Sequence, residues 1–176
     1  MYIDDIIKVM PPVNNPLDVP TQSQWIAIEG KLGTGLPDDY KEFIQTYGTG
    51  KVDDFLYVFT PFSVNENLNL FDQLKLQSDV LVELKSYGEN VPYKIFPEVE
   101  GVIPFAITDN GDVLFWKTST EPNDWTVLVN EARSPDWEKY EMSMSKFLSE
   151  IVSHRLSCKI FPKSFPSASP KFEVSH

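Results

Sequence analysis

The stretch WIAIEGKLGTGLPDDYKEFIQTYGTG, residues 25–50, decides the fold, because it predicts two helices joined by a short turn. Ahead of it, Thr21 and Gln24 have the spacing of a capping box at a helix start. Helical apolar spacing then marks one stripe in each helix, formed by Trp25, Ile28 and Leu32 in the first and by Tyr40, Phe43, Ile44 and Tyr47 in the second.

Glycine, proline and aspartate set the ends of these two helices. Gly33 can end the first helix because glycine accepts positive φ without steric cost. Pro37 suits the first turn of the second helix, where Asp38 and Asp39 meet the positive end of the helix dipole. Gly48 is the expected stop. The segment therefore predicts a helix–turn–helix platform with two apolar faces.

The remaining elements predict an α+β fold, a single domain with a mostly antiparallel sheet packed against several helices. The expected order is an amphipathic start within residues 1–20, a strand at 55–59, a helix capped by Asn65 and running to Tyr87, strands at 102–108 and 113–117 around an Asn-Gly turn, a strand at 126–129 and a helix at about 143–156. One face of such a sheet can remain toward water and be available to a partner.

The chain divides by composition into a domain at residues 1–156 and a Pro/Ser-rich tail at residues 157–176. Prolines and serines predict neither a helix nor a packed strand in the tail. Charge divides in the same way, because residues 1–156 carry 12 Lys plus Arg against 25 Asp plus Glu, a balance of −13, whereas the tail carries +2.

An acidic field of this size repels nucleic acid, because binding the phosphate backbone needs cationic surface. It attracts a basic protein and speeds the encounter with it. The alternative is that the acidity only keeps the domain in solution. We expect no membrane contact and a cytoplasmic location, because no apolar run is long enough to span a bilayer and the start MYIDDI lacks a secretory pattern.

Residues with catalytic or metal-binding potential are few and poorly arranged. His154 and Cys158 have i, i+4 spacing, but a metal site or a nucleophilic dyad needs further groups that the sequence does not supply nearby. The acid pairs Asp53/Asp54 and Glu98/Glu100 are most simply solvated faces. We therefore expect no cofactor, no metal and no enzymatic activity.

Two segments together resemble the SUKH superfamily. The first matches its opening at Trp25, Ile28, Glu29, Leu32, Gly33, Leu36, Pro37, Asp39, Tyr40, Lys41, Phe43, Ile44, Tyr47, Gly48 and Gly50. The second is VIPFAITDNGDVLFW, residues 102–116, with Pro104 beside a short strand and Gly111 in a Gly-Asp turn before an aromatic strand. We expect these motif positions to define the fold, with Trp25 in the core and Glu29 fixing the turn or pairing with a lysine.

The resemblance implies an α/β domain that binds another protein, typically as the immunity partner of a bacterial toxin. It also leaves open a scaffold or regulatory role, because the superfamily includes fungal cell-wall regulators. A third alternative is a small hydrolase that uses a carboxylate pair. For an immunity protein, we expect a basic cognate toxin to contact acids around an exposed aromatic anchor, namely Asp53, Asp54, Glu98, Glu100, Asp109, Asp112 and Trp125.

Overall fold

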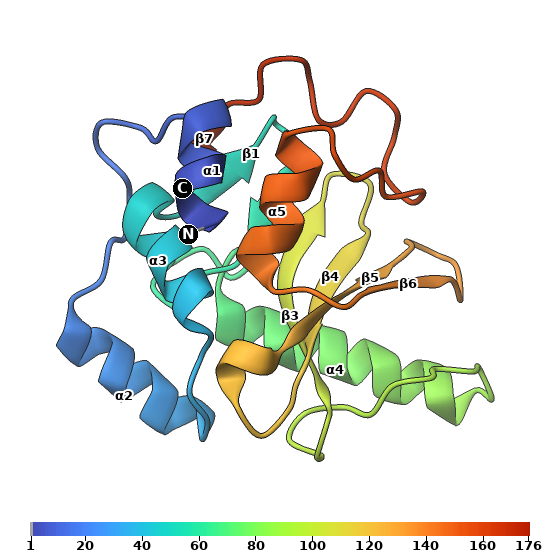
Figure 1. Cartoon of the computed structure of the whole chain (residues 1–176). Helices are drawn as coiled ribbons and strands as arrows, with labels where there is room; N and C mark the ends of the chain where they lie inside the picture. The colour runs from blue at the N-terminus through green and yellow to red at the C-terminus, as the bar shows by residue number, and fades with distance from the viewer. Residues whose placement is uncertain (1) are drawn as a thin grey trace.

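The computed structural model describes residues 2–176 and has the predicted α+β architecture (Figure 1). Its helices are α1 (Tyr2–Val9), α2 (Gln22–Leu32), α3 (Asp38–Tyr47), α4 (Leu70–Ser86) and α5 (Met144–Val152), with a short 3₁₀ turn at Pro122–Asp124. Its strands are β1 (Gly50–Val52), β2 (Leu56–Val58), β3 (Val102–Thr108), β4 (Val113–Lys117), β5 (Thr126–Asn130), β6 (Trp137–Tyr140) and β7 (Phe172–Val174). The strands form one antiparallel sheet in the order β6-β5-β4-β3-β2-β1-β7.

The helix pair α2–α3 forms where the sequence predicts it, because its caps satisfy the terminal backbone groups. Thr21 accepts a hydrogen bond from the Gln24 amide at 3.3 Å, and the Gln24 side chain accepts one from the Thr21 amide at 2.8 Å. Gly33 closes α2 in the left-handed region, at φ +83°. Asn123 holds the start of α3, since its side-chain oxygen accepts a 2.8 Å hydrogen bond from the Asp38 amide.

Helices cover both faces of the sheet. On the inner side of the sheet, α5 contacts β5 and packs with α1 and α3, and the largest hydrophobic core lies among these helices and the strands. The outer face packs against α4, which crosses β3 and encloses a second, smaller core with Val113, Phe115 and Leu128. Figure 1 shows α5 and α4 on opposite sides of the strands. The expectation that one face is open to water therefore fails for the part of the outer face under α4.

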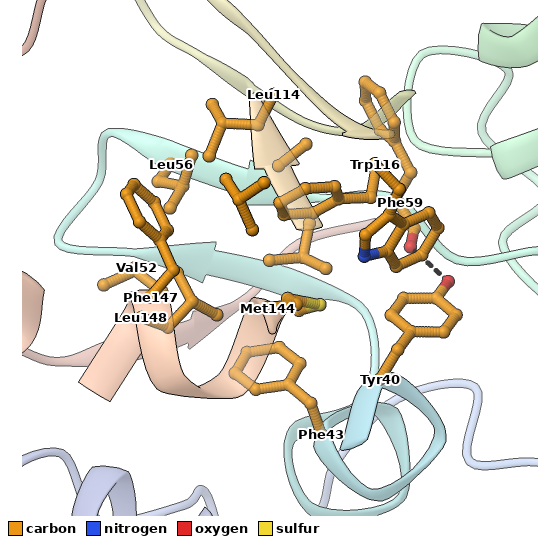
Figure 2. Close-up of a cluster of buried hydrophobic side chains, with 14 of the residues drawn as sticks. Tyr40, Phe43, Val52, Leu56, Phe59, Leu114, Trp116, Met144, Phe147 and Leu148 are labelled. Atoms are coloured by element: carbon orange, nitrogen blue, oxygen red, sulfur yellow. Dashed lines mark hydrogen bonds between the residues drawn. The ribbon is translucent and has the colours of Figure 1, made fainter. Parts of the chain in front are cut away.

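The centre of the main core is an aromatic cluster that joins α3 to the sheet. Tyr40 meets Trp116 edge to face at 4.9 Å between ring centroids, and Phe105 stacks on the same indole at 4.8 Å. The Tyr40 hydroxyl donates a 2.6 Å hydrogen bond to the Phe59 carbonyl (Figure 2). Burial raises the pKa of Tyr40 well above its usual value, so the phenol stays neutral and remains a donor.

Some element boundaries differ from the sequence-based expectation. Asn69 caps α4, because its side chain accepts from the amide of Phe71, so the prediction of Asn65 as the cap is wrong. Asn65 instead holds the loop ahead of α4, where its side-chain oxygen accepts from the Asn67 amide at 2.9 Å. The sequence does not predict the short strands β1 and β6, because neither has enough alternation of apolar and polar residues to be distinguished from a loop.

The prediction that residues 157–176 contain no packed strand is also wrong. Strand β7 pairs with β1, with Val52 opposite Phe172, and the side chains of Phe161, Phe165 and Phe172 are buried in the main core. Proline and serine composition missed this because three phenylalanines provide the apolar surface that orders the segment. The tail is thus an integral part of the folded domain.

The first prediction concerns the Tyr40 hydroxyl. Tyr40→Phe leaves the buried Phe59 carbonyl without its donor, which should lower the free energy of unfolding by about 1–3 kcal/mol. The control is Tyr57→Phe on the partly exposed face of β2, expected to cost less than about 0.5 kcal/mol. Urea unfolding followed by tryptophan fluorescence measures both, and equal midpoints for the two variants would contradict the assignment.

The second prediction concerns the tail. A chain ending at residue 156 loses three buried phenylalanines, so its unfolding free energy should fall by several kcal/mol, at about 1.5–3 kcal/mol per side chain. Removal of residues 175–176 alone is the matched control and should shift the urea midpoint only slightly. If the chain ending at 156 unfolds at the wild-type midpoint, the tail does not belong to the core.

Candidate functional site

The part of the outer face that α4 leaves uncovered contains a hollow of about 250 Å³. Side-chain alternation creates it: Leu56 and Val58 enter the core, so Tyr57 between them points outward beside its register partner Ile107. Asp109, at the start of the β3–β4 turn, lies at the rim with an exposed carboxylate. The hollow is lined by Tyr57, Asn65, Asn67, Leu68, Ile107, Thr108, Asp109 and Ser175.

The charges beside this hollow come from β1, β7 and the turn between β1 and β2. Lys51 lies 5.8 Å from the Tyr57 ring centroid, forms an ion pair with Asp54, and has its amine 3.8 Å from the carboxylate of Glu173. The hydrogen bond to Asp54 is the main cause of a raised pKa for Lys51, so the lysine keeps its charge. This arrangement offers a partner an aromatic surface with carboxylates at its edge.

The structure brings together only part of the predicted acidic set. Asp54 and Asp109 lie at the same end of the sheet, because the Asp109 amide donates a 2.8 Å hydrogen bond to the Phe55 carbonyl of the neighbouring turn. Glu98 and Glu100 precede β3 and lie at its other end. Seven strand residues separate the two groups, a span of roughly 20 Å. The two groups therefore lie at opposite ends of β3.

Asp53 binds the C-terminal tail, and its carboxylate accepts three hydrogen bonds from within the domain. One oxygen accepts from the Ser167 amide at 2.7 Å, and the other accepts from the Ser167 hydroxyl at 3.1 Å and the Lys171 amide at 3.0 Å. The Asp53 amide also donates to the Lys171 carbonyl at 2.8 Å. These bonds fix the segment that leads into β7 and give Asp53 a structural role that the sequence did not reveal.

Asp112 is likewise a structural residue. Its side chain is buried, accepts a 2.7 Å hydrogen bond from the Thr108 hydroxyl, and accepts a 2.9 Å hydrogen bond from the Ala132 amide. The carboxylate thus ties the β3–β4 turn to the β5–β6 turn, while Gly111 provides the left-handed residue that the turn needs, at φ +91°. The expectation that Asp112 contacts a partner is wrong.

Trp125 is not the exposed anchor that its loop position suggested. The side chain is 2% exposed and packs against Trp116 at 5.6 Å between ring centroids. Its indole nitrogen donates a 3.1 Å hydrogen bond to the Ser119 carbonyl. The 3₁₀ turn at Pro122–Asp124 directs the ring inward, which propensity alone does not reveal.

Glu29 shapes the turn between α2 and α3. One carboxylate oxygen accepts from the Leu36 amide at 2.8 Å and from the Lys41 amine at 3.0 Å. Trp25 is buried against Tyr40 and Phe62. Neither of these motif residues lines the hollow beside Tyr57.

His154 has a backbone contact at one ring nitrogen, and Cys158 is buried. Ring nitrogen Nε2 of His154 lies 2.9 Å from the Ser167 carbonyl, which occupies it. Cys158 is buried, and burial is the main cause of the raised pKa of its thiol. Within residues 2–176, no cluster of three or more His, Cys, Asp or Glu side chains could hold a metal ion. None of the helices in this range has the length and apolarity needed to cross a bilayer.

Tyr57 and Ile107 are binding candidates that sequence reasoning missed. The segment 55–59 was interpreted as a strand buried on both faces, because all of its residues are apolar or aromatic. The outward position of Tyr57 follows only from the pairing of β2 with its two neighbours, β1 and β3, which the sequence does not show. The only signal in the sequence is the tyrosine hydroxyl, which favours a position with one polar edge.

A protein-family model matches most of the chain. The model of the SMI1-KNR4 cell-wall family, SUKH_6, matches residues 22–148, from the start of α2 into α5. The chain belongs to this family. The resemblance to the SUKH superfamily is thereby confirmed. A search of curated protein sequences found no match. Both α1 and β7 of this SUKH domain lie outside the matched range.

The third prediction tests the inertness of Cys158. Iodoacetamide should alkylate this thiol at least about a hundredfold more slowly in the native protein than in urea, because reaction requires local opening of the fold. The matched control moves the thiol by one position, as Ser157→Cys in a Cys158→Ser background, where the side chain is exposed and should react quickly. Mass spectrometry over time gives both rates. Fast native alkylation of Cys158 would restore it as a candidate nucleophile.

Proposed function

We propose that this SUKH domain is a non-enzymatic immunity protein that binds a basic toxin domain and blocks its active cleft. Family membership supports a protein-binding role, and the uncovered outer face supplies a surface for it. The observation that carries the proposal is the combination of that surface with the balance of −13 over residues 1–156. No bond is made or broken in this mechanism.

The proposed mechanism depends on charge complementarity between this domain and the toxin. A toxin that acts on nucleic acid has a cationic cleft, because it must hold phosphates. Carboxylates such as Asp54 and Asp109, carried on short turns of a packed sheet, can occupy the places of those phosphates and exclude the substrate. Long-range attraction between the acidic domain and the basic cleft accelerates the encounter.

Rigidity of the turns supports this role. The Asp109 turn is fixed by the backbone hydrogen bond to Phe55 and by the buried Asp112 carboxylate. A preordered surface loses little conformational entropy on binding. Tyr57 adds a large side chain of the kind that is enriched at the centres of protein interfaces.

A regulatory scaffold is the second candidate, because the matched family model carries a cell-wall description. The proposed hydrolase alternative has less support, since the acids of the Asp53–Asp54 pair are engaged separately: Asp53 binds the tail and Asp54 pairs with Lys51. Acid–base catalysis needs two carboxylates directed at one substrate.

The direct test is coexpression with the C-terminal domain of the protein encoded by the adjacent gene. Growth should be arrested by that domain alone and restored by this chain, and the two proteins should copurify as a complex. Growth rescue without copurification would point to an indirect or enzymatic action. Failure of both would reject the immunity role.

The fourth prediction concerns salt. The association rate with the toxin domain should fall at least about tenfold between 0.02 and 0.3 M NaCl, because screening shortens the range of the field to about 10 Å at 0.1 M. Stopped-flow fluorescence measures the rate, and the dissociation rate serves as the internal control, with a much weaker salt dependence. An association rate that is independent of salt would remove the electrostatic part of the mechanism.

A further inference from the structure

Helix α4 exposes aliphatic side chains on one flank. Leu76 is 50% exposed and Val80 is 40% exposed, and four residues place them on the same flank of the helix. The side of α4 that faces the sheet is formed by other residues, with Leu70 and Leu81 buried. Two exposed aliphatic side chains do not make an interaction surface by themselves, so the shape and charge around them decide what this flank can bind.

A hollow lies beside each of these two side chains. Leu76 lines one of about 380 Å³, and Val80 lines another of about 410 Å³ whose far wall includes Val113 and Ala132. The first hollow shares Asn67 with the hollow beside Tyr57. The second hollow has no lining residue in common with these two, and it adjoins the first through Leu76 and Val80, which lie one turn apart on α4. We call the two hollows with Leu76 and Val80 between them the acidic groove.

Carboxylates outnumber cations among the charged residues of the acidic groove. Its acidic residues are Glu66, Asp72, Asp79, Glu89 and Glu131. Its cations are Lys75 and Arg133, and Lys75 already pairs with Asp79 at 2.6 Å. An apolar centre with an anionic border is complementary to a surface that is apolar along its middle and cationic at its edges.

We propose that the acidic groove binds a basic amphipathic α-helix of the partner. This inference rests on the proposed immunity function and deepens it by stating the chemistry of the partner. Leucine-like side chains of the bound helix pack on Leu76 and Val80, and its Lys or Arg residues face the carboxylates. From Asp72 to Glu83, α4 offers about 17 Å of helix, which is enough for three turns of a packed partner helix.

Strand addition at a sheet edge explains these features less well. The edge strand β7 has three residues, and the other edge, β6, carries Lys139 in an ion pair with Glu141. Charged side chains on short edges oppose pairing with another chain. A strand added at either edge would also leave Leu76 and Val80 uncovered.

The first arm of the test uses a synthetic helical peptide of 18 residues, titrated by fluorescence anisotropy in 0.1 M NaCl. Leucines at i, i+3, i+4 and i+7 form its apolar stripe, lysines flank the stripe, and alanines on the remaining face favour the helix. The pair Leu76→Ser/Val80→Ser should weaken binding about tenfold or more, because it removes two aliphatic contacts. The matched pair Ile26→Ser/Val82→Ser removes two aliphatic side chains of similar exposure outside the groove and should change affinity less than about twofold.

Further variants guard against misfolding and against nonspecific charge attraction. Asp72→Asn/Asp79→Asn keeps the shape of α4, and it should weaken binding several-fold with an unchanged circular dichroism spectrum. A twin peptide with glutamates in place of lysines should not bind. Equal affinity of the groove pair and the control pair, or no binding of the cationic peptide to the wild type, overturns the proposal.

The second arm repeats the measurement with the toxin domain. Its outcomes distinguish a wrong groove assignment from a wrong immunity role. If the wild type binds the toxin domain and the groove pair binds it equally well, the groove assignment is wrong and the immunity role stands. If the wild type does not bind the toxin domain, the immunity role fails, and the peptide arm still decides whether the groove accepts a basic helix.

Discussion

The Tyr40 hydroxyl, buried between α3 and the sheet, is the contact on which the arrangement of this domain depends. It donates to the Phe59 carbonyl just after β2, while the Tyr40 ring meets Trp116 of β4 and Trp25 of α2. A single side chain thus fixes the helix pair against two strands. Glu29 sets the turn that aims α3 at this point, by accepting from the Leu36 amide and the Lys41 amine. The family motif therefore encodes the position of a platform, and its aromatic residues Trp25, Tyr40, Phe43 and Tyr47 are buried in the core.

The outer face follows from this inner framework. With α1, α3 and α5 on one side of the sheet, side-chain alternation sends Tyr57 and Ile107 to the other, and α4 covers only part of that face. The C-terminal segment completes the sheet, since β7 pairs with β1 and Asp53 holds the approach to it. The phenylalanines of this segment, Phe161, Phe165 and Phe172, are buried in the main core. The uncovered region thus has defined borders: α4 on one side and the β7 edge on the other.

Local chemistry allowed much of this fold to be predicted. The α2 cap, the α3 bounds and the strands β3 and β4 depend on glycine, proline and short-range spacing, which the sequence displays directly. The pairing of β7 could not be predicted, because a three-residue strand gains its stability from a partner far away in the chain. The roles of Asp53, Asp112 and Trp125 were missed for the same reason. Carboxylates that bind backbone amides and carboxylates that face solvent look alike in sequence, and a loop tryptophan shows its burial only when its contacts are known.

The domain combines an inner platform of packed helices with an outer face on which we propose that the partner binds. Hydrogen–deuterium exchange of the free chain and of its complex with the toxin domain tests this distinction most directly. Added protection should be concentrated in α4 and in the segments around Tyr57 and Asp109, with the exchange of α2 and α3 unchanged. Protection confined to α2 and α3, with α4 exchanging as in the free chain, would contradict this proposal.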